Sequence, residues 1–233
     1  MKLAEFFKYI AYGELSQLAI GNSNQGEIAL SDYPKLISHI NLGLTQLHTR
    51  LPIRHNEVFL IANEGNQRYR LHTDHLTDNA TSNEPKYLQH ADLPFTDNLL
   101  RIEQVFQYNG DEVPLNDETA KFSAFTPRSD VLQFSQPISE VLSVLYRADH
   151  VRLPMKAGLD ITSLNLDIPD VCIEPLLNYV TNRVLGSQSS SDALNNAAGY
   201  AIKFEQQLQQ LERSGLWQTE MPTNLRLEKN GWV

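Results

Sequence analysis

The chain has 233 residues, of which 41% are hydrophobic and 20% are charged, and its 19 basic and 28 acidic residues give a net charge of −9. This composition excludes a disordered or collagen-like polymer and is typical of one globular domain or two small ones. A chain of this length buries about 70% of the surface that its unfolded form exposes, so it needs no disulfide or metal for stability. The acidic excess and the lack of a Lys/Arg cluster argue against tight nucleic-acid binding, which depends on neutralising phosphates.

Cys172 is the single cysteine, so the chain cannot form an internal disulfide. It lies between two apolar residues at a predicted helix start, where a packed small side chain is more common than a reactive thiol. No run of about 18 apolar residues is present, and the N-terminus lacks the charged start, apolar run and cleavage site of a signal peptide. The sequence therefore predicts a soluble protein that is made in the cytosol and has no membrane partner.

The first 52 residues have the apolar spacing of helices. Residues 2–19 predict two short helices separated by a break at Gly13. The next helix accepts Pro34 in its first turn, where a missing N–H costs nothing, and it ends before Pro52.

Helical spacing returns in the last third of the chain. A third helix is predicted to open at 168–170, but Pro175 is unfavourable inside a helix, which places the regular start near Glu174. A fourth helix is capped by Ser191 and ends at Gly215. None of these helices can bury its apolar face alone, so we expect the N- and C-terminal helices to pack together.

The middle of the chain, 53–167, has the short spacing of strands. Residues 58–61 and 68–71 predict a hairpin, the polar stretch 72–98 predicts a long loop, and Asn109-Gly110 predicts a type I′ turn. Further short strands are expected at 100–108, 113–115, 121–125, 131–134, 141–147 and 164–167. This pattern is typical of a small antiparallel barrel or sandwich.

The predicted fold class is therefore α+β, with N- and C-terminal helices forming a helical bundle and an inserted antiparallel β barrel or sandwich domain. The expected domains are a bundle from 1–52 and 168–215, a β-rich domain from 53–167, and an extended C-terminal tail from 216–233.

Enzyme motifs give no positive support for catalysis. Nucleotide-binding loops and serine-hydrolase elbows are missing from the sequence. His72, Asp74 and His75, with Asp78 nearby, form the one run that resembles a metal site. Solvated loop residues explain this short run better than metal ligands, because a metal site needs converging partners and a second shell of hydrogen bonds. We therefore predict no catalytic residue, no cofactor and no bound metal.

Acidic residues are concentrated in the middle of the chain. Residues 72–130 hold 11 acidic and 4 basic side chains, which accounts for −7 of the net charge of −9. One interpretation is an ordinary solvated surface. The other is a surface that repels a second polyanion over about a Debye length of roughly 8 Å. In that case Asp111, Glu112, Asp117 and Glu118 are candidates for the repelling surface.

Both tryptophans lie in the last 17 residues, at Trp217 and Trp232, with Arg226 between them. Such a tail can fold back over its own core, or it can anchor onto a neighbouring protein, because Trp and Arg are enriched at binding hot spots.

The layout resembles the head-to-tail adaptor, or tail tubular protein A, family of short-tailed bacteriophages. The resemblance spans the chain from end to end and rests on a pattern of short motifs. These are Gly13-Glu14-Leu15, Ile40-Asn41, Leu44-Thr45-Gln46-Leu47, Arg50, Ile168-Pro169-Asp170, Tyr179-Val180, Arg183, Ala198, Tyr200, Phe204 and Glu205.

The resemblance implies a ring of twelve subunits at the head–tail interface of the virion, docked beneath the portal protein and continuing its channel towards the tail nozzle protein. The helices would form the ring and the β domain would form a tube. The tail with Trp217, Arg226 and Trp232 would reach the portal, and Asp111, Glu112, Asp117 and Glu118 would line the path of double-stranded DNA without binding it. Two alternatives remain open, a metal-dependent hydrolase centred on His72, Asp74 and His75, and another neck or tail-completion structural protein.

Overall fold

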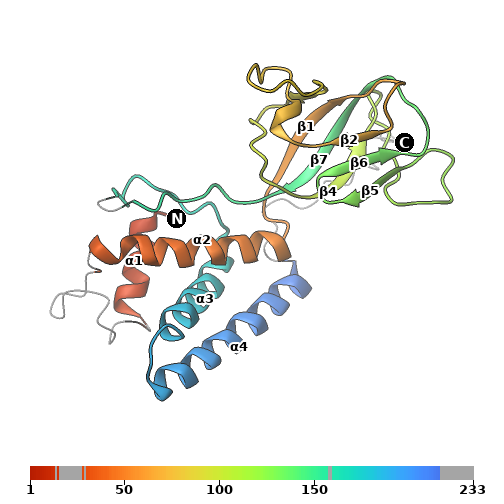
Figure 1. The fold of residues 1–233 in the computed structure, drawn as a ribbon. Coiled ribbons are helices and arrows are strands. Elements are labelled where there is room, and N and C mark those ends of the chain that lie inside the picture. The colour runs from red at the N-terminus through yellow and green to blue at the C-terminus, as the bar shows by residue number, and fades with distance from the viewer. Residues whose placement is uncertain (14, 16–27, 29, 157–158, 216–233) are drawn as a thin grey trace, which may run out of the picture. The chain divides into compact units, whose positions relative to one another are not determined.

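The computed structural model describes residues 1–13, 15, 28, 30–156 and 159–215. The chain divides into two compact units. We call Met1–Ile53 with Val151–Val233 the helical unit, and Arg54–His150 the β unit. The described residues form four α-helices and two antiparallel sheets (Figure 1), so the predicted α+β class is confirmed.

The first two helices of the helical unit are α1 (Leu3–Tyr12) and α2 (Tyr33–Arg50). Glu5 accepts a hydrogen bond from the Lys2 backbone N–H at the start of α1, and Gly13 follows its last turn. Pro34 lies in the first turn of α2, as predicted, where its missing N–H has no helical partner to lose. The second short helix predicted after Gly13 falls outside the described residues.

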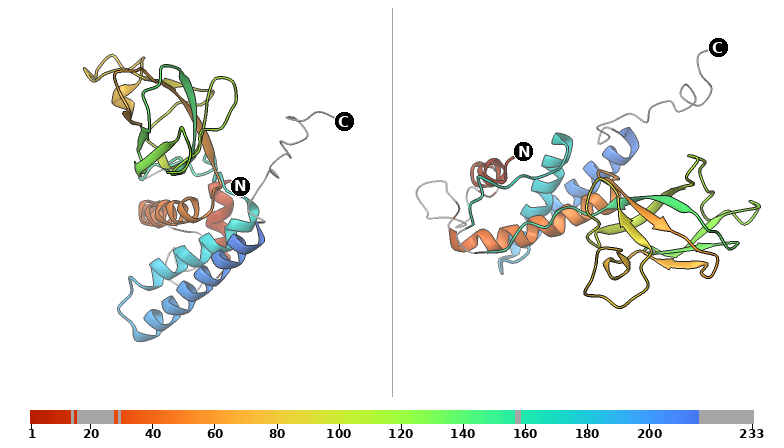
Figure 2. Two further views of the ribbon diagram at one scale, coloured as in Figure 1. Left: turned by 90° about the vertical axis from the view of Figure 1, so that its right-hand side faces the viewer. Right: turned by 90° about the horizontal axis from the view of Figure 1, so that it is seen from above.

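The C-terminal helices are α3 (Ile173–Leu185) and α4 (Ser191–Ser214), which lie side by side (Figure 2). Pro175 is compatible with α3 because it lies in the first turn, where the backbone N–H groups have no helical acceptor. The cap of α4 is Ser190, one residue before the prediction, and its hydroxyl accepts the Ala193 N–H at 3.2 Å. Gly215 ends α4 with a left-handed φ of 66°, which glycine adopts without strain.

All four helices share one apolar core, which also takes in the chain that returns from the β unit. Leu153, Leu166 and Ile168 are buried in this core. Residues 164–167 were expected to form a strand of the β domain, but they lie beside the start of α1, where Leu3 N–H donates to the Leu164 carbonyl. The β unit therefore ends at His150 and not at residue 167, because the returning segment is apolar enough to complete the helical core.

The β unit holds two antiparallel sheets that do not close into a barrel. The first has four strands in the order β3 (Leu88–His90), β1 (His55–Ile61), β7 (Val141–Ala148) and β4 (Leu99–Phe106). The second has three strands in the order β2 (Arg68–Arg70), β6 (Val131–Phe134) and β5 (Ala124–Arg128). Residues 113–115, which were predicted as a strand, do not form one; Leu115 makes a single isolated bridge to Ala124.

The predicted hairpin of 58–61 with 68–71 is wrong, because β1 and β2 belong to different sheets. β1 pairs along its whole length with β7, from His55 opposite Arg147 to Ile61 opposite Val141. The turn that follows β1 is held instead by the buried Tyr69, whose hydroxyl donates to backbone carbonyls of the turn and accepts the Asn63 N–H. The chain thus crosses from one sheet to the other at this point.

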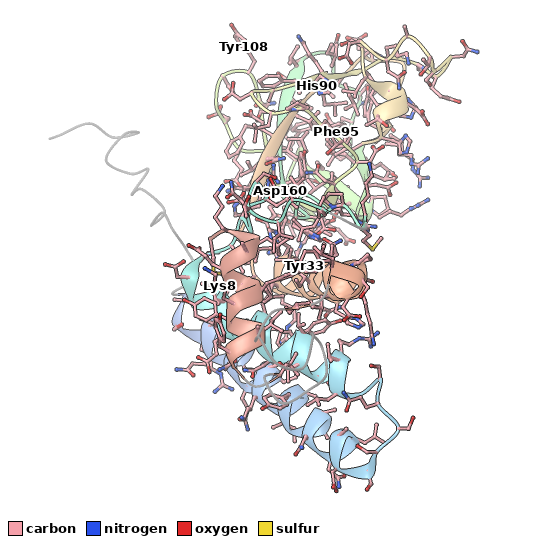
Figure 3. The ribbon with its side chains drawn as sticks, turned by 90° about the vertical axis from the view of Figure 1, so that its left-hand side faces the viewer. Lys8, Tyr33, His90, Phe95, Tyr108 and Asp160 are labelled. Carbon is pink, nitrogen blue, oxygen red and sulfur yellow. The ribbon has the colours of Figure 1, made fainter. Side chains whose placement is uncertain are left out.

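Both sheets contribute side chains to a single core in the β unit. Phe95 packs edge-on against Tyr146 at the centre, and both are buried. Figure 3 shows Phe95 inside this unit and Tyr108 at its surface, where Tyr108 is 90% exposed. None of the described helices is long and apolar enough to cross a membrane.

Candidate functional site

Asp111 and Glu112 lie in the turn that follows β4. The Gln107 N–H donates to the Asp111 carbonyl at 2.8 Å. Gly110 has a positive φ of 85° but Asn109 does not have a positive φ, so the predicted type I′ turn is wrong. Asp111 accepts a hydrogen bond from the Asn109 side chain at 2.7 Å, and both acidic residues are exposed. The structure therefore presents these two carboxylates to solvent.

Asp117 and Glu118 lie further along the same connection, beside the edge strand β5. Asn116, immediately before them, donates its N–H to the Ala124 carbonyl at 2.8 Å and so holds the segment against β5. The Asp117 carboxylate accepts hydrogen bonds from the Thr119 hydroxyl and N–H, which lower the pKa of Asp117. Glu118 is exposed and forms no ion pair within the described part of the chain.

Charge is unequally divided between the two units. Arg54–His150 carries 15 acidic and 8 basic side chains, so the β unit has a net charge of −7 out of the total of −9. The remaining −2 belongs to all other residues of the chain. The β unit is therefore the part of the molecule that repels polyanions most strongly.

Exposed apolar side chains, unlike the acidic excess, are more numerous on the helical unit than on the β unit. Of the thirteen large apolar side chains that are well exposed among the described residues, nine belong to the helical unit. They are Tyr9, Tyr12, Leu30, Leu42, Val151, Met155, Val171, Leu194 and Ile202. On α4, Leu194 and Ile202 flank Ala198 at intervals of four residues, which places the three on one face of the helix. We call these three residues the α4 stripe.

Several residues that carry the family resemblance hold the helical unit together. Arg50, at the end of α2, forms ion pairs with Glu205 at 2.6 Å and with Glu212 at 2.8 Å, both on α4. Asn41 on α2 binds the returning chain twice, because its amide donates to the Leu153 carbonyl and accepts the Leu153 N–H, each at 2.9 Å. These contacts join segments from opposite ends of the sequence.

A second set of resemblance residues lies where α2, α3 and α4 meet. Tyr179 on α3 packs edge-on against Phe204 on α4. Their ring centroids are 5.3 Å apart, inside the range of about 4.5–7 Å that such pairs prefer. α2 approaches this pair closely at Gly43, where an added Cβ would lie 2.6 Å from Leu176 Cδ1 and 2.9 Å from Tyr179 Cδ1. These residues therefore serve packing, with no sign of a ligand site in the described structure.

The run His72, Asp74 and His75 does not converge on one point. His72 contacts two carboxylates, with Nδ1 3.0 Å from Asp74 Oδ2 and Nε2 3.6 Å from Asp97 Oδ2. His75 turns away and stacks on Tyr87, and its Nδ1 lies 2.9 Å from the Pro85 carbonyl oxygen. No group of three or more metal-ligating side chains is found among the described residues.

The polar stretch 72–98 is an ordered part of the β unit. It contains the short 3₁₀ helix η2 (Thr73–His75) and the strand β3. Asp97 joins its two ends, because its carboxylate accepts hydrogen bonds from the Thr73 N–H at 2.7 Å and the Thr73 hydroxyl at 2.6 Å. These bonds explain how Asp97 retains a positive φ of 57°.

Two further sequence predictions have different outcomes. Trp217, Arg226 and Trp232 lie outside the described residues, so the structure does not place the candidate tail anchor. Cys172 is fully buried, and burial raises the pKa of its thiol to about 11. The thiol is thus held in its protonated, weakly nucleophilic form, in agreement with the expected packing role.

Sequence reasoning missed a cluster of exposed arginines on the three-stranded sheet, formed by Arg68, Arg70 and Arg128. The alternation of Arg68, Tyr69 and Arg70 in a strand is a signal that both arginines share one face. The third member could not be found in this way, because Arg128 comes next to them only through the sheet order β2-β6-β5.

Comparison with known proteins does not identify a family. No protein-family model matches the chain, and no curated protein matches it. The resemblance to the head-to-tail adaptors therefore stays a prediction.

Proposed function

We propose that this protein is a head-to-tail adaptor of a short-tailed bacteriophage, a structural subunit that forms a closed ring beneath the portal and continues the DNA channel towards the tail nozzle. In this proposal the four helices form a bundle that builds the ring, and the β unit is an inserted domain that extends it as a tube. The protein acts by shape and contact, without a cofactor, and it resides at the head–tail interface of the virion.

The observation that carries the proposal is the separation of surface chemistry between the two units. The helical unit holds nine of the thirteen exposed large apolar side chains, while the β unit holds a net charge of −7. Leu194 and Ile202 share one exposed face of α4, and contiguous exposed apolar surface is typical of protein–protein contacts. A helical unit that associates and a β unit that repels polyanions are what a ring around DNA requires.

Ring closure favours this arrangement further. In a closed ring each subunit presents two different faces, and each contact is repeated around the ring, so modest apolar contacts suffice. The α4 stripe is our candidate for one of these faces, because Leu194 is 49% exposed and Ile202 is 58% exposed. A dodecamer, matching the portal, is the proposed assembly.

In this proposal the acidic surface of the β unit faces the DNA that passes through the channel. Asp111, Glu112, Asp117 and Glu118 are exposed or half-exposed, and no basic side chain pairs with them in the described structure. We assign the acidic character of the β unit to the DNA path, because each phosphate that a protein neutralises adds affinity and slows transit. The channel would then guide DNA without holding it.

The experiment is assembly on portal-bearing heads that lack the adaptor. Wild-type protein should sediment with the heads as a ring, whereas Leu194→Glu with Ile202→Glu should stay in the supernatant with an unchanged far-UV circular dichroism spectrum. Asn195→Glu, an exposed polar position on the same helix, is the matched control and should assemble. Assembly of the double variant at the wild-type level would contradict the role of the α4 stripe.

Deletion of residues 216–233 tests the proposed portal anchor. The truncated protein should keep its helical spectrum and lose binding to portal. Retained binding to portal would contradict the role of Trp217, Arg226 and Trp232. Wild-type binding to the nozzle but not to the portal would favour another neck or tail-completion protein.

A further inference from the structure

Three exposed arginines form a basic surface on the acidic β unit. Arg68 and Arg70 flank the buried Tyr69 on the edge strand β2, and Arg128 ends β5. Arg70 and Arg128 both lie opposite Val131 of the central strand β6, one on each side of it. We call Arg68, Arg70 and Arg128 the arginine face.

Among the described residues, one carboxylate, that of Asp130, forms ion pairs with this face. Asp130 Oδ2 is 2.9 Å from Arg70 Nε, and Asp130 Oδ1 is 3.3 Å from Arg128 Nε. Although burial opposes it, the hydrogen bond from Arg70 and the charge of Arg128 hold the pKa of Asp130 below its usual range. Both ion pairs use Nε, and Arg68 forms no ion pair within the described residues, so the terminal guanidinium nitrogens remain available to another anion.

An acidic segment flanks the strand β5 of the same sheet. Residues 114–116 run beside β5, since the Ala124 N–H donates to the Pro114 carbonyl at 2.9 Å and the Asn116 N–H donates to the Ala124 carbonyl at 2.8 Å. Asn116 also binds Thr126 on β5 through its side chain. Asp117 and Glu118 follow directly, so they flank β5 while Arg68 and Arg70 lie on β2 at the other edge.

We propose that the arginine face of one copy binds Asp117 and Glu118 of the next copy in a head-to-tail contact between β units. This inference rests on the ring proposed above and adds the contact between neighbouring β units. Head-to-tail assembly needs two different, complementary surfaces on each subunit. Here they are the arginine face, which extends from β2 to the end of β5, and the acidic segment that follows Asn116 beside β5. Guanidinium groups bind carboxylates through paired, planar hydrogen bonds, so three arginines are suited to this partner.

A second copy fits better than DNA as the partner. A protein that holds duplex DNA by its backbone typically makes about 6–10 phosphate contacts, whereas this face offers three arginines beside one aspartate. The β unit that carries it has a net charge of −7, which repels a polyanion of duplex length. Of the four acidic residues considered above for the DNA path, Asp111 and Glu112 keep that role, whereas Asp117 and Glu118 are reassigned to the contact between copies.

The test uses charge reversal in the full chain, with association measured by sedimentation velocity and by binding to portal-bearing heads. Arg68→Glu and Glu118→Arg are suitable because neither side chain forms an ion pair within the described residues. Arg101→Glu and Asp92→Arg make the same charge changes at exposed positions outside both surfaces and serve as controls.

Each single reversal should weaken association by more than about tenfold, because like charges meet at the contact. A chain that carries both reversals should recover, and so should an equal mixture of the two single variants, in which each altered surface meets its complement. Association of wild-type protein should also weaken between 50 and 500 mM salt, taken as about a threefold change in Debye length.

Three outcomes would overturn the inference. If wild-type protein associates and the reversals behave like their controls, the contact is refuted while the ring proposal stands. If wild-type protein retains a 30-base-pair duplex, taken as roughly three helical turns, and Arg68→Glu releases it, the arginine face binds DNA instead. If wild-type protein associates neither alone nor on heads, the proposed function fails together with the contact.

Discussion

His39 on α2 should make the helical unit less stable in mild acid. Both of its ring nitrogens are shielded from solvent and have no hydrogen-bond partner among the described residues, although the residue as a whole is only half-buried. Burial lowers the pKa of His39 below its ordinary value of 6.5, and the positive charges of Arg183 and Lys35 lower it further. The unfolded chain therefore binds a proton at His39 more readily than the folded chain does.

The sign of the effect follows from this difference. The contribution of His39 to stability is fully present above pH 6.5 and is lost as the pH falls from 6.5 through the lower pKa of the folded state. One such group changes the free energy of unfolding by at most about 1.4 kcal/mol per pH unit. Because His39 is partly exposed, solvent screening reduces the slope, and we expect about half of that ceiling.

The assay is urea unfolding followed by helical circular dichroism at pH 7.5 and pH 5.5, for wild-type protein and for His39→Leu. The leucine removes the titrating group and the two unpaired nitrogens, so the variant should lose less stability on acidification than wild type. All other titrating groups are common to both proteins and cancel in the comparison. Equal losses of stability in the two proteins would refute the assigned role of His39.

Three further substitutions test the contacts of the helical unit by urea unfolding. Gly43→Val should destabilise it by about 1–3 kcal/mol, since new atoms would overlap Leu176 and Tyr179, and an unchanged midpoint would disprove this close approach. Asn41→Ala should cost about 1–3 kcal/mol by leaving the Leu153 backbone unpaired, and Asn41→Gln should not restore it. Arg50→Ala should cost about 1 kcal/mol at low salt and less in 1 M salt, whereas a salt-independent loss would point to packing.

Helix ends were well predicted from the sequence because each depends on one or two residues. Pro34 favours a helix start because its fixed φ is helical and its missing N–H has no partner to lose there. Gly215 favours a helix end because glycine adopts the left-handed φ that follows the last turn. Pro175 was harder to interpret, since its cost depends on whether it falls in the first turn or one turn later. The predicted start near Glu174 lies one residue from the observed start at Ile173, which places Pro175 in the first turn.

Strand partners could not be predicted in the same way. β1 lies next to β2 in sequence but pairs with β7, because pairing reflects the packing of a whole sheet and not a local preference. Residues of the candidate site that come together only through strand pairing could not be predicted either. Acidic residues at the surface were foreseen, but the arginine face was not, because Arg128 approaches Arg70 only after three strands have assembled.

The two ends of the β unit meet, because the Ala148 N–H donates to the Arg54 carbonyl at 2.9 Å. A segment whose first and last residues are adjacent can be joined to the rest of the chain without displacing the elements on either side of it. Changes of length within residues 54–150 should therefore leave the packing of the four helices unchanged. A graft of residues 54–150 onto a foreign surface turn should likewise fold, since its termini already match the spacing of a tight loop.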